Sequence, residues 1–245
     1  MPNNSAVAFI PARSGSKRIL HKNIYRLNGV PLLAYSVIAA LESKIFDEVI
    51  CVTDSMEYKK IAEDYGASVP MLRPKSISTD TSSDIDWLKW IFKYLHSENR
   101  RYKFFSILRP TSPFRTSETI KRAWNEFYDS KGFDSLRAVE LCKQHPGKMW
   151  SINNEKLIPI ISEFDKDGTP WHSMQYAALP PVFVQNASLE MALYDKTIAR
   201  GSISGKTIKA FLTRGIEGFD INQPDDLILA KHLLKEESNN FYLNQ

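Results

Sequence analysis

A short apolar stretch near the start of the chain leads into a loop that combines small residues with cations. Residues 7–10 are apolar and predict a short buried strand. Ser14, Gly15 and Ser16 follow, and their small side chains let the backbone turn with its N–H groups facing inward. Four cations belong to the same loop: Arg13, Lys17, Arg18 and Lys22. Backbone donors and cations at the carboxyl end of a first strand favour a site for the phosphates of a nucleotide.

An ordinary strand-to-helix connection with solvated basic residues is the alternative to a phosphate site. The loop contains neither the Gly-x-x-x-x-Gly-Lys-Ser/Thr pattern of a P-loop nor the Gly-x-Gly-x-x-Gly pattern of a dinucleotide site. We favour phosphate binding because the position of the loop after a first strand and its composition point the same way. The sequence therefore predicts a nucleotide site of another kind.

The segments that must position this loop alternate between helical and strand-like patterns over the first 140 residues. Helical apolar spacing occurs in residues 31–43, 56–65, 84–96 and 118–128. Strand-like runs occupy residues 48–53, 68–72, 104–108 and 135–141. This alternation predicts an α/β fold in three layers, with a mostly parallel sheet covered by helices on both faces. Ligands then bind at the carboxyl ends of the strands.

The pattern changes after residue 145. Residues 148–184 are rich in Trp, Pro, Ile and Tyr, have no long helical period and contain the turn sequence Asp-Lys-Asp-Gly at 165–168. We expect extended segments joined by that turn, which form a protruding β-rich arm within a single domain that spans residues 1–245. Its apolar surface needs a partner, and a second subunit would supply it. Further strand-like runs and a last helix follow at residues 189–194, 207–212 and from Asn222-Gln-Pro224 onward.

The composition is typical of a soluble globular protein. The chain has 245 residues, enough for one large α/β domain, and 43% of them are hydrophobic. Lys and Arg number 32 against 28 Asp and Glu, and this small excess is spread along the chain, so we expect no nucleic-acid partner. The sequence shows no secretory signal pattern and no apolar run of the ~20 residues that span a bilayer, so we expect a cytoplasmic protein without membrane contact. Cys51 and Cys142 lie in separate apolar runs and indicate structural thiols.

Several short sequences carry a family resemblance along nearly the whole chain. They are Ile10-Pro-Ala-Arg-Ser-Gly-Ser-Lys17 with Lys22-Asn23, Thr53-Asp54, Leu72-Arg-Pro74 with Asp80-Thr-Ser82, Pro110-Thr-Ser-Pro-Phe-Arg115, His145-Pro-Gly-Lys148 and Asp220-Ile-Asn222. On these motifs the chain resembles the acylneuraminate cytidylyltransferases, the CMP-sialic acid synthetase family of nucleotidyltransferases. The resemblance implies a Rossmann-like sheet of the GT-A type and a homodimer in which the arm is the dimerisation element.

The resemblance also implies a reaction in which a sugar hydroxyl attacks the α-phosphate of CTP, releasing pyrophosphate and forming a CMP-sugar. The implied acceptor is a small acidic nonulosonic sugar of the sialic, legionaminic or pseudaminic acid type. Arg13 and Lys17 match the triphosphate clamp and, with Asp220, form the implied catalytic set. Arg73 and Ser82 match the positions that read cytosine. The implied nucleotide-binding residues are Ala12, Arg13, Ser14, Gly15, Ser16, Lys17, Asn23, Arg73 and Ser82.

Asp220 matches the first acid of the family's metal motif, whose usual form is Asp-x-Asp. The resemblance therefore implies Mg²⁺ as the cofactor, held by Asp220 and Asn222. Asn222 is a neutral oxygen ligand where the family has a second acid, a departure that bears on metal affinity and geometry. The alternative role for Asp220 is an N-terminal helix cap. Asp225 and Asp226 lie at the start of a helix and are interpreted as complementing its dipole.

The acceptor side departs further from the family. Arg109 stands where sialate-activating members have Gln, and Tyr176 stands near their carboxylate-binding arginine. We therefore interpret Arg109 as the carboxylate or phosphate grip of a rearranged pocket. Lys148 and Asn186 match sugar-side residues of the family. Strand alternation from Asn186 places Glu190 inward, where it could bind an acceptor hydroxyl or amine, and an outward surface carboxylate is the alternative.

Two other functions remain open at this point. A sugar-1-phosphate nucleotidyltransferase with a different acceptor or base would suit the additional cation at Arg109. A non-catalytic nucleotide- or sugar-binding protein on the same fold would suit Asn222. His145 and His172 have no recognisable orienting partner in the sequence, so we favour structural roles for both over a role as general base.

Overall fold

The computed structural model describes the backbone of residues 5–243 and the side chains of residues 5–236. The chain forms two compact units. The first unit consists of the residues up to 138 and those from 186 onward, and the second consists of residues 139–185. The second unit contains the segment 148–184 that the sequence singles out as an arm.

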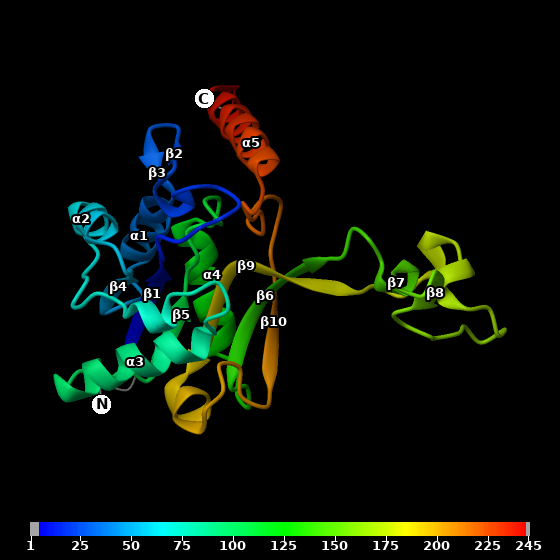
Figure 1. Cartoon of the computed structure of the whole chain (residues 1–245), viewed down its shortest axis with the longest axis horizontal. Helices are drawn as coiled ribbons and strands as arrows, with labels where there is room; N and C mark the ends of the chain where they lie inside the picture. Colours follow the sequence, from blue (N-terminus) through cyan, green and yellow to red (C-terminus); the bar gives the residue numbers. More distant parts are fainter. Residues whose placement is uncertain (1–4, 244–245) are drawn as a thin grey trace. The chain divides into compact units, whose positions relative to one another are not determined.

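A six-stranded mixed sheet forms the centre of the first unit (Figure 1). Across the sheet, the strands are β10 (Ile208–Leu212), β6 (Ser135–Leu141), β9 (Phe183–Leu193), β5 (Phe104–Ile107), β1 (Ala6–Pro11) and β4 (Glu48–Val52). Strand β1 is parallel to both of its neighbours, and Phe9 is paired with Ile50 on one side and Ile107 on the other. Strand β9 runs antiparallel to β5. The predicted α/β fold is therefore confirmed, with a mixed sheet in which β4, β1 and β5 are parallel to one another.

Alternate residues of the central strands pack against opposite layers of helices. The helices that cover the sheet are α1 (Leu32–Ser43), α2 (Met56–Asp64), α3 (Asp84–Ser97) and α4 (Ser117–Tyr128). Ala8 and Ile10 belong to one hydrophobic core with residues of α1, α2 and α4. Val7 and Phe9 belong to a second core with α3, where the rings of Phe9 and Phe92 lie 5.3 Å apart. The period of two along each strand thus produces the three layers.

A third hydrophobic cluster holds the last helix, α5 (Pro224–Leu243), against the hairpin of β2 (Arg26–Leu27) and β3 (Val30–Pro31). Ile221 and Leu227 are buried in this cluster beside Ile19 and Phe114. These side chains come from three segments that lie far apart in the sequence. Their burial brings the segment around residue 221 to the loop after β1 and the loop after β5.

The second unit contains a small hairpin of β7 (Trp150–Asn153) and β8 (Lys156–Pro159). Its turn is formed by Asn154 and Glu155, which have φ angles of 46° and 67°. The predicted turn at 165–168 also forms: the N–H of Gly168 donates to the carbonyl of Asp165 at 3.1 Å, and Phe164 and Pro170 form an antiparallel bridge across it. The hairpin of β7 and β8 was not predicted. Two consecutive residues with positive φ make the turn that a two-residue hairpin needs, but Glu is a poor signal for it because side chains with a Cβ rarely adopt this conformation.

Short 3-10 helices connect the regular elements. They are η1 (Lys22–Ile24), η2 (Lys75–Ile77), η3 (Pro146–Lys148), η4 (Trp171–Ser173), η5 (Tyr176–Ala178), η6 (Tyr194–Lys196) and η7 (Ile198–Arg200). The predicted strand at 68–72 is wrong, because only a single bridge joins Ser68 to Ile50. Pro70 interrupts this run and has no N–H to extend the ladder. The other predicted helices and strands up to residue 141 lie within two residues of the observed ones.

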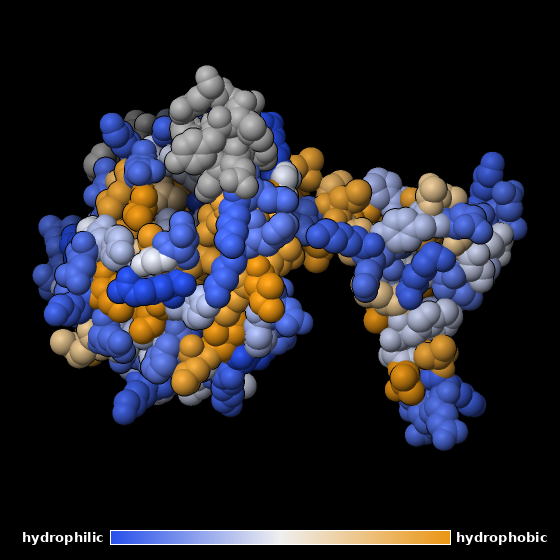
Figure 2. Space-filling model, turned by 90° about the horizontal axis from the view of Figure 1, so that it is seen from above, coloured by the Kyte–Doolittle hydropathy of each residue, from blue (hydrophilic) through white to orange (hydrophobic). Residues whose placement is uncertain are grey.

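Exposed apolar side chains are prominent in the second unit. They include Ile152, Leu157, Ile158, Ile160 and Phe164. Figure 2 shows apolar side chains among charged ones on the surface of the molecule. Among the described residues, no helix is both long and apolar enough to span a bilayer. Cys51 and Cys142 are free thiols, and burial raises the pKa of Cys51 to about 12.

Candidate active site

A pocket of about 630 Å³ opens in the first unit where four loops meet. Two of these loops follow β1 and β5, the third joins α2 to α3, and the fourth precedes α5. The lining side chains with hydrogen-bonding groups are Arg13, Ser16, Lys17, Arg18, Lys22, Asn23, Arg73, Thr79, Asp80, Ser82, Asp84, Arg109, Thr111, Asp220 and Asn222. The convergence of these loops at the carboxyl ends of parallel strands agrees with the expectation from the sequence.

The loop after β1 is held in place by polar contacts at both of its ends. Asp54, just beyond β4, accepts hydrogen bonds from the backbone N–H of Ser14 at 2.7 Å and from its hydroxyl at 2.9 Å. The buried amide of Asn23 donates to the carbonyl of Arg13 at 3.0 Å. The N–H of Ser16 donates to the carbonyl of Ser14. Two of the three N–H groups predicted to face a phosphate, those of Ser14 and Ser16, are therefore engaged within the protein.

The cations of this loop form an exposed cluster with Asp80, which we call the clamp cluster (Arg13, Lys17 and Asp80). One carboxylate oxygen of Asp80 accepts from Arg13 at 2.7 Å, and the other lies 2.5 Å from the ammonium of Lys17. These hydrogen bonds and charges lower the pKa of Asp80. Lys17 is 82% exposed and Asp80 is 34% exposed, so the cluster is open to solvent. A single carboxylate thus bridges two cations, as the oxygens of a phosphate would.

Arg73 is buried on the pocket wall and holds η2 in the loop between α2 and α3. It is 5% exposed, and its Nε donates to the carbonyl of Ile77 at 2.7 Å. Its guanidinium also lies 5.9 Å from the ring centre of Trp87 in α3. Burial lowers the pKa of Arg73 from its usual value. The hydroxyl of Ser82 accepts from the N–H of Thr79 at 2.9 Å, which closes the adjoining turn.

Asp220 presents a buried carboxylate oxygen without a hydrogen-bond partner in the described part of the chain. Its other oxygen accepts from the amide of Asn222. Lys22 donates to the carbonyl of Ile221 at 2.8 Å, and burial lowers the pKa of Lys22 even though Asp220 opposes this shift. Asp220 lines the pocket, and an oxygen with no proton donor next to it suits a cation.

The start of α5 is capped by a different acid. The carboxylate of Asp226 accepts hydrogen bonds at 2.7 Å from the N–H groups of both Asn222 and Gln223. This agrees with the interpretation of Asp226 as a residue that complements the helix N-terminus. The alternative role of Asp220 as the helix cap is not supported, because its carboxylate accepts no hydrogen bond from the described N–H groups of that helix start.

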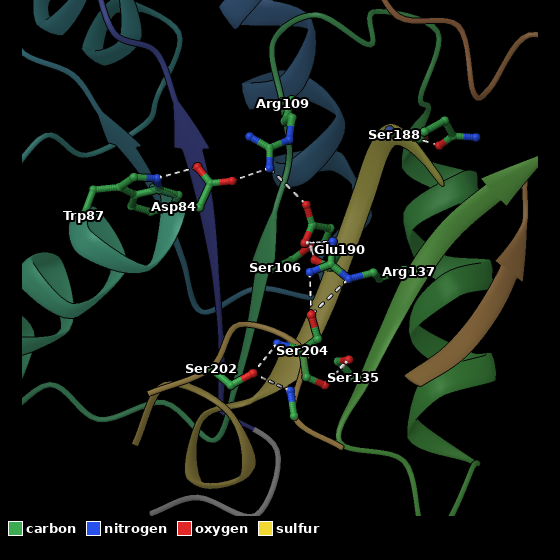
Figure 3. A network of polar contacts seen from close by, with 12 residues as sticks. Asp84, Trp87, Ser106, Arg109, Ser135, Arg137, Ser188, Glu190, Ser202 and Ser204 are labelled. Atoms are coloured by element: carbon green, nitrogen blue, oxygen red, sulfur yellow. Dashed lines mark hydrogen bonds and ion pairs between the residues drawn. The ribbon is translucent and has the colours of Figure 1, made fainter. Parts of the chain in front are cut away.

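Arg109, which lines the pocket, is held by two carboxylates (Figure 3). Its Nη2 donates to Asp84 at 2.5 Å and to Glu190 at 3.0 Å. The indole N–H of Trp87 donates to the other oxygen of Asp84 at 2.7 Å. Burial disfavours the charge of Arg109, but the two carboxylates outweigh it and raise the pKa of Arg109 above its usual value. Glu190 in turn pairs with Arg137 at 2.7 Å. We call Asp84, Arg109, Glu190 and Arg137 the Arg109 network.

Arg115 lies beneath this network and supports the loop that carries Arg109. Its side chain is 1% exposed, and burial lowers its pKa to about 9. It donates to the carbonyls of Ser188 and Arg109 and, at 2.5 Å, to the hydroxyl of Ser36. That hydroxyl donates to the same Arg109 carbonyl at 3.1 Å. Arg115 therefore fixes backbone rather than a ligand, a role that its place at the end of a motif did not reveal.

Comparison with known proteins assigns the chain to a family. A family model described as cytidylyltransferase matches residues 7–145. The chain belongs to the cytidylyltransferase family. The CMP-N,N'-diacetyllegionaminic acid synthase of Legionella pneumophila is 34% identical over 94% of this chain and 96% of its own length. The pseudaminic acid cytidylyltransferase of Campylobacter jejuni is 38% identical, but the match spans 55% of this chain and 58% of that protein.

A further relative and the solved structures agree with this membership. The N-acylneuraminate cytidylyltransferase of Escherichia coli is 46% identical over 48% of this chain, which is 27% of its own length. A structure of CMP:2-keto-3-deoxy-manno-octonic acid synthetase in complex with CTP covers 95% of this chain with a TM-score of 0.68. Its identity is 16%, so it shows the fold alone. As a member of this family, the protein is a nucleotidyltransferase.

The remaining predicted residues of this nucleotidyltransferase lie outside the pocket wall. Asn186 donates to the hydroxyl of Thr213 at 2.9 Å, and its neighbour Ala187 lines the pocket instead. Glu190 is buried, so its reading as an outward surface carboxylate is wrong. Lys148 belongs to the second unit, where its ammonium donates to the carbonyls of His172 and Met174.

Tyr176 also belongs to the second unit. Its hydroxyl lies within 2.9 Å of the carbonyls of Cys142 and Lys143. In the same unit, His145 accepts from the N–H of Gly147 at 3.0 Å, and its other ring nitrogen lies 2.9 Å from the carbonyl of Pro180. Both nitrogens of His145 are thus used within the fold, which agrees with the structural role favoured for it.

Four polar pocket residues were missed as candidates: Thr79, Asp80, Asp84 and Thr111. Asp80 belongs to the motif Asp80-Thr-Ser82, from which only Ser82 was predicted to bind the nucleotide. Asp84 stands at the first turn of a predicted helix, where an acid is expected for the helix dipole. Thr111 accepts the N–H of Ile221 through its carbonyl, a backbone contact that side-chain type does not announce.

Proposed function

We propose that the protein transfers CMP from CTP to an acidic nonulosonic sugar of the sialic, legionaminic or pseudaminic acid type and releases pyrophosphate. Family membership and the names of the relatives support this reaction. The observation that carries it is the pocket itself, in which Arg13, Lys17 and Lys22 lie with Asp220 and with Arg109. This arrangement has cations for a triphosphate and a further cation for an acidic acceptor.

The clamp cluster supports the assignment of the triphosphate to Arg13 and Lys17. Both cations already bind one carboxylate, that of Asp80, and a triphosphate offers several oxygens of higher charge density. We infer that the phosphates of CTP replace Asp80 and that the cations then stabilise the departing pyrophosphate. Lys22, whose charge is disfavoured by burial, gains a counter-charge when phosphate arrives. Arg73, Ser82 and Asn23 line the same pocket and are proposed to contact the cytidine.

We propose that Asp220 and Asn222 hold Mg²⁺ beside the phosphates. The residues fit this ion, because Asp220 has a buried oxygen without a donor and Asn222 contributes an amide oxygen. Among the described residues, no group of three or more His, Cys, Asp or Glu side chains could hold a metal, so most ligands must come from phosphate and water. When bound, the ion would neutralise phosphate charge and polarise the α-phosphate towards attack.

We propose that Arg109 binds the carboxylate of the acceptor. Asp84 and Glu190 both engage its Nη2, and within the described residues its Nη1 and Nε make no hydrogen bond. Arginine suits a carboxylate because it offers several N–H groups in one plane. Lys148, Tyr176 and Asn186 stay predictions for the sugar side.

We also propose that the protein forms a homodimer through the second unit. This unit exposes large apolar side chains, with Ile152 at 75% and Leu157 at 60%. Isolated exposed apolar residues are ordinary, but several within one small unit indicate a partner surface. Light scattering of the whole chain should give the mass of a dimer, and replacing Ile152 and Leu157 with Ser should shift it towards the monomer. Ile228→Ser, at a position in α5 that is 70% exposed, is the matched control and should leave the mass unchanged.

Release of pyrophosphate tests the proposed reaction directly. The purified protein is given CTP, UTP, ATP or GTP with a panel of nonulosonic acids and sugar 1-phosphates, in Mg²⁺ or in EDTA. We expect release only with CTP, a nonulosonic acid and Mg²⁺. Activity confined to a sugar 1-phosphate would instead support the alternative acceptor that the additional cation at Arg109 allows. Absence of release with every pair, together with measurable CTP binding, would show a binding protein without turnover.

A further inference from the structure

The Arg109 network extends beyond the pocket into the sheet. Arg109 and Asp84 line the pocket, whereas Glu190 in β9 and Arg137 in β6 are not among its lining residues. Figure 3 shows Glu190 between the two arginines. We propose that Glu190 and Arg137 are positioning residues that set the affinity for the acceptor by fixing the guanidinium of Arg109. This inference rests on the proposed function, because it assumes that Arg109 binds the acceptor.

Each oxygen of the Glu190 carboxylate has a different arginine as its partner. One oxygen lies 3.0 Å from Nη2 of Arg109, and the other lies 2.7 Å from Nη1 of Arg137. The side chain of Glu190 is 10% exposed, so little water competes for these contacts. A carboxylate held at both oxygens has one orientation available. The place of the Arg109 guanidinium therefore depends on Arg137 through Glu190.

Arg137 is itself anchored at its far side. Its Nη2 and Nε donate to the hydroxyl of Ser204 at 2.6 Å and 3.2 Å. The turn that carries Ser204 is closed by the hydroxyl of Ser202, which accepts from the N–H groups of Ser204 and Gly205. The network thus runs from a closed turn, through the half-buried Arg137 and the buried Glu190, to a pocket arginine. Every member has a fixed partner on both sides.

The charges of the network balance, and this bears on what it can do. Two arginines pair with two carboxylates, so the Arg109 network as a whole has no net charge. The network fixes the orientation of the Arg109 guanidinium, whereas a free arginine side chain loses rotamer entropy when it binds a ligand. Prior fixing by Asp84 and Glu190 removes most of this cost from the acceptor. Loosening Glu190 should therefore weaken the acceptor and leave the nucleotide as before.

A purely structural ion network is the competing interpretation, and a matched control separates the two. Arg122 pairs with Glu217 at 2.5 Å and is 20% exposed, close to the 18% of Arg137. Arg122 is not among the pocket residues. Arg122→Met should lower Tm without changing the KM of either substrate. Arg137→Met should lower Tm and also raise the acceptor KM by about tenfold, with the KM for CTP within about twofold of wild type.

A double-mutant cycle tests whether Arg137 acts through Arg109. In an Arg109→Gln background, Arg137→Met should change the acceptor KM by less than about twofold, because the group that it positions is gone. Arg137→Lys should recover part of the acceptor affinity, since an ammonium can hold one oxygen of Glu190 but not Ser204 as well. If Arg137→Met does not fold, Glu190→Gln serves, because it keeps the shape and loses one charge.

Each outcome has a defined meaning. A tenfold rise of the acceptor KM that disappears in the Arg109→Gln background supports the positioning role. An unchanged acceptor KM, an equal rise for both substrates, or an undiminished effect in that background overturns it and leaves the proposed function standing. No pyrophosphate release by the wild-type protein with any acceptor overturns the proposed function, and this inference falls with it.

Discussion

The clamp cluster and the Arg109 network both pair arginine with carboxylate at one pocket, yet the network continues into a more buried pair, Glu190 with Arg137. In the clamp cluster, Asp80 is 34% exposed and bridges Arg13 and Lys17 from a surface turn. In the Arg109 network, Glu190 is 10% exposed and Arg137 is 18% exposed, and both lie on strands. Exposed pairs contribute little because water and salt compete with them, whereas breaking a buried pair leaves a charge without a partner. A ligand can therefore replace Asp80 in the clamp cluster, whereas replacing Glu190 in the Arg109 network would cost more free energy.

This difference predicts that the protein binds its two substrates in different ways. If Arg13 and Lys17 bind the triphosphate as proposed, its charge can displace Asp80, so this site does not need to be arranged in advance. A sugar carboxylate brings one charge and gains more from an arginine that already has its final orientation. The following predictions test this difference between the clamp cluster and the Arg109 network, from the largest expected effect to the smallest.

Asp220→Ala should have the largest effect, because it removes the only carboxylate that we assign to the metal. We expect kcat to fall by about 10²–10³-fold, the range found when a group that stabilises transition-state charge is removed. The measurement is pyrophosphate release at saturating CTP and acceptor over a series of Mg²⁺ concentrations. Asp225→Asn, at an exposed position in the first turn of the same helix, is the control and should keep wild-type activity.

Arg109→Gln should act on the acceptor alone. We expect the acceptor KM to rise by about 10–100-fold, because a charged hydrogen bond to a carboxylate is lost, while the KM for CTP stays near wild type. Initial rates with each substrate varied in turn give both constants. Unchanged acceptor affinity would remove the support for Arg109 as the carboxylate grip. A rise in the KM for CTP would contradict the separation of the two sets of residues.

More of the residues predicted for the nucleotide than of those predicted for the sugar line the pocket, and the reason is physical. Arg13, Lys17 and Asn23 lie within one loop, so a local rule about strand ends is enough to place them. The partners of Arg109 lie 25 and 81 residues away, at Asp84 and Glu190. A contact of this range depends on the strand order, which a single sequence does not show.

Local ambiguity hid the same partners. Asp84 stands where a helix N-terminus favours any acid, so its pairing with Arg109 left no separate signal. Arg137 lies in a strand whose apolar pattern was recognised, but nothing in that pattern says which face carries an ion pair. Glu190 was placed inward by alternation, which the structure bears out, yet its partners were not foreseen. The hairpin turn at Asn154 and Glu155 was missed for a similar reason, because Glu rarely signals positive φ.

Asp84→Asn tests the cost of breaking the network at its half-buried end, where Arg109 and Asp84 are 28% and 29% exposed. We expect a loss of about 1–2 kcal/mol at neutral pH, because Arg109 loses one of its two carboxylates, and a fall in Tm of about 2–8 °C. Burial opposes ionisation of Asp84, but Arg109 and Trp87 outweigh it and lower the pKa of Asp84 below its usual value. A lowered pKa adds stability above the unfolded-state value of about 3.9, and this stability is lost as pH falls through the folded-state pKa.

The dependence of Tm on pH in acid therefore provides a second check on Asp84. The Tm difference between wild type and Asp84→Asn should be largest near neutral pH and should shrink below about pH 4, where the wild-type carboxyl becomes protonated. Thermal unfolding followed by circular dichroism across this range gives the measurement. Burial opposes ionisation of Glu48, but Arg100 and Tyr102 outweigh it and lower the pKa of Glu48. Glu48 therefore makes the stability of both proteins fall in acid, and only the difference in Tm between wild type and Asp84→Asn reports on Asp84. A constant difference at all pH values would argue against a charged Asp84–Arg109 pair.

Asp80→Asn should have the smallest effect and the opposite sign, which makes it the sharpest contrast with Asp84→Asn. Without the Asp80 carboxylate, Arg13 and Lys17 have no internal competitor, so we expect the KM for CTP to fall by about two- to threefold, with the acceptor KM and Tm unchanged. Because the pair is exposed, the gain should shrink as salt is added. A rise in the KM for CTP would show that Asp80 helps to bind the nucleotide. Asp80 would then stay paired with its cations when CTP binds, as Glu190 stays paired with Arg109. Exchange of a carboxylate for phosphate would no longer distinguish the clamp cluster from the Arg109 network.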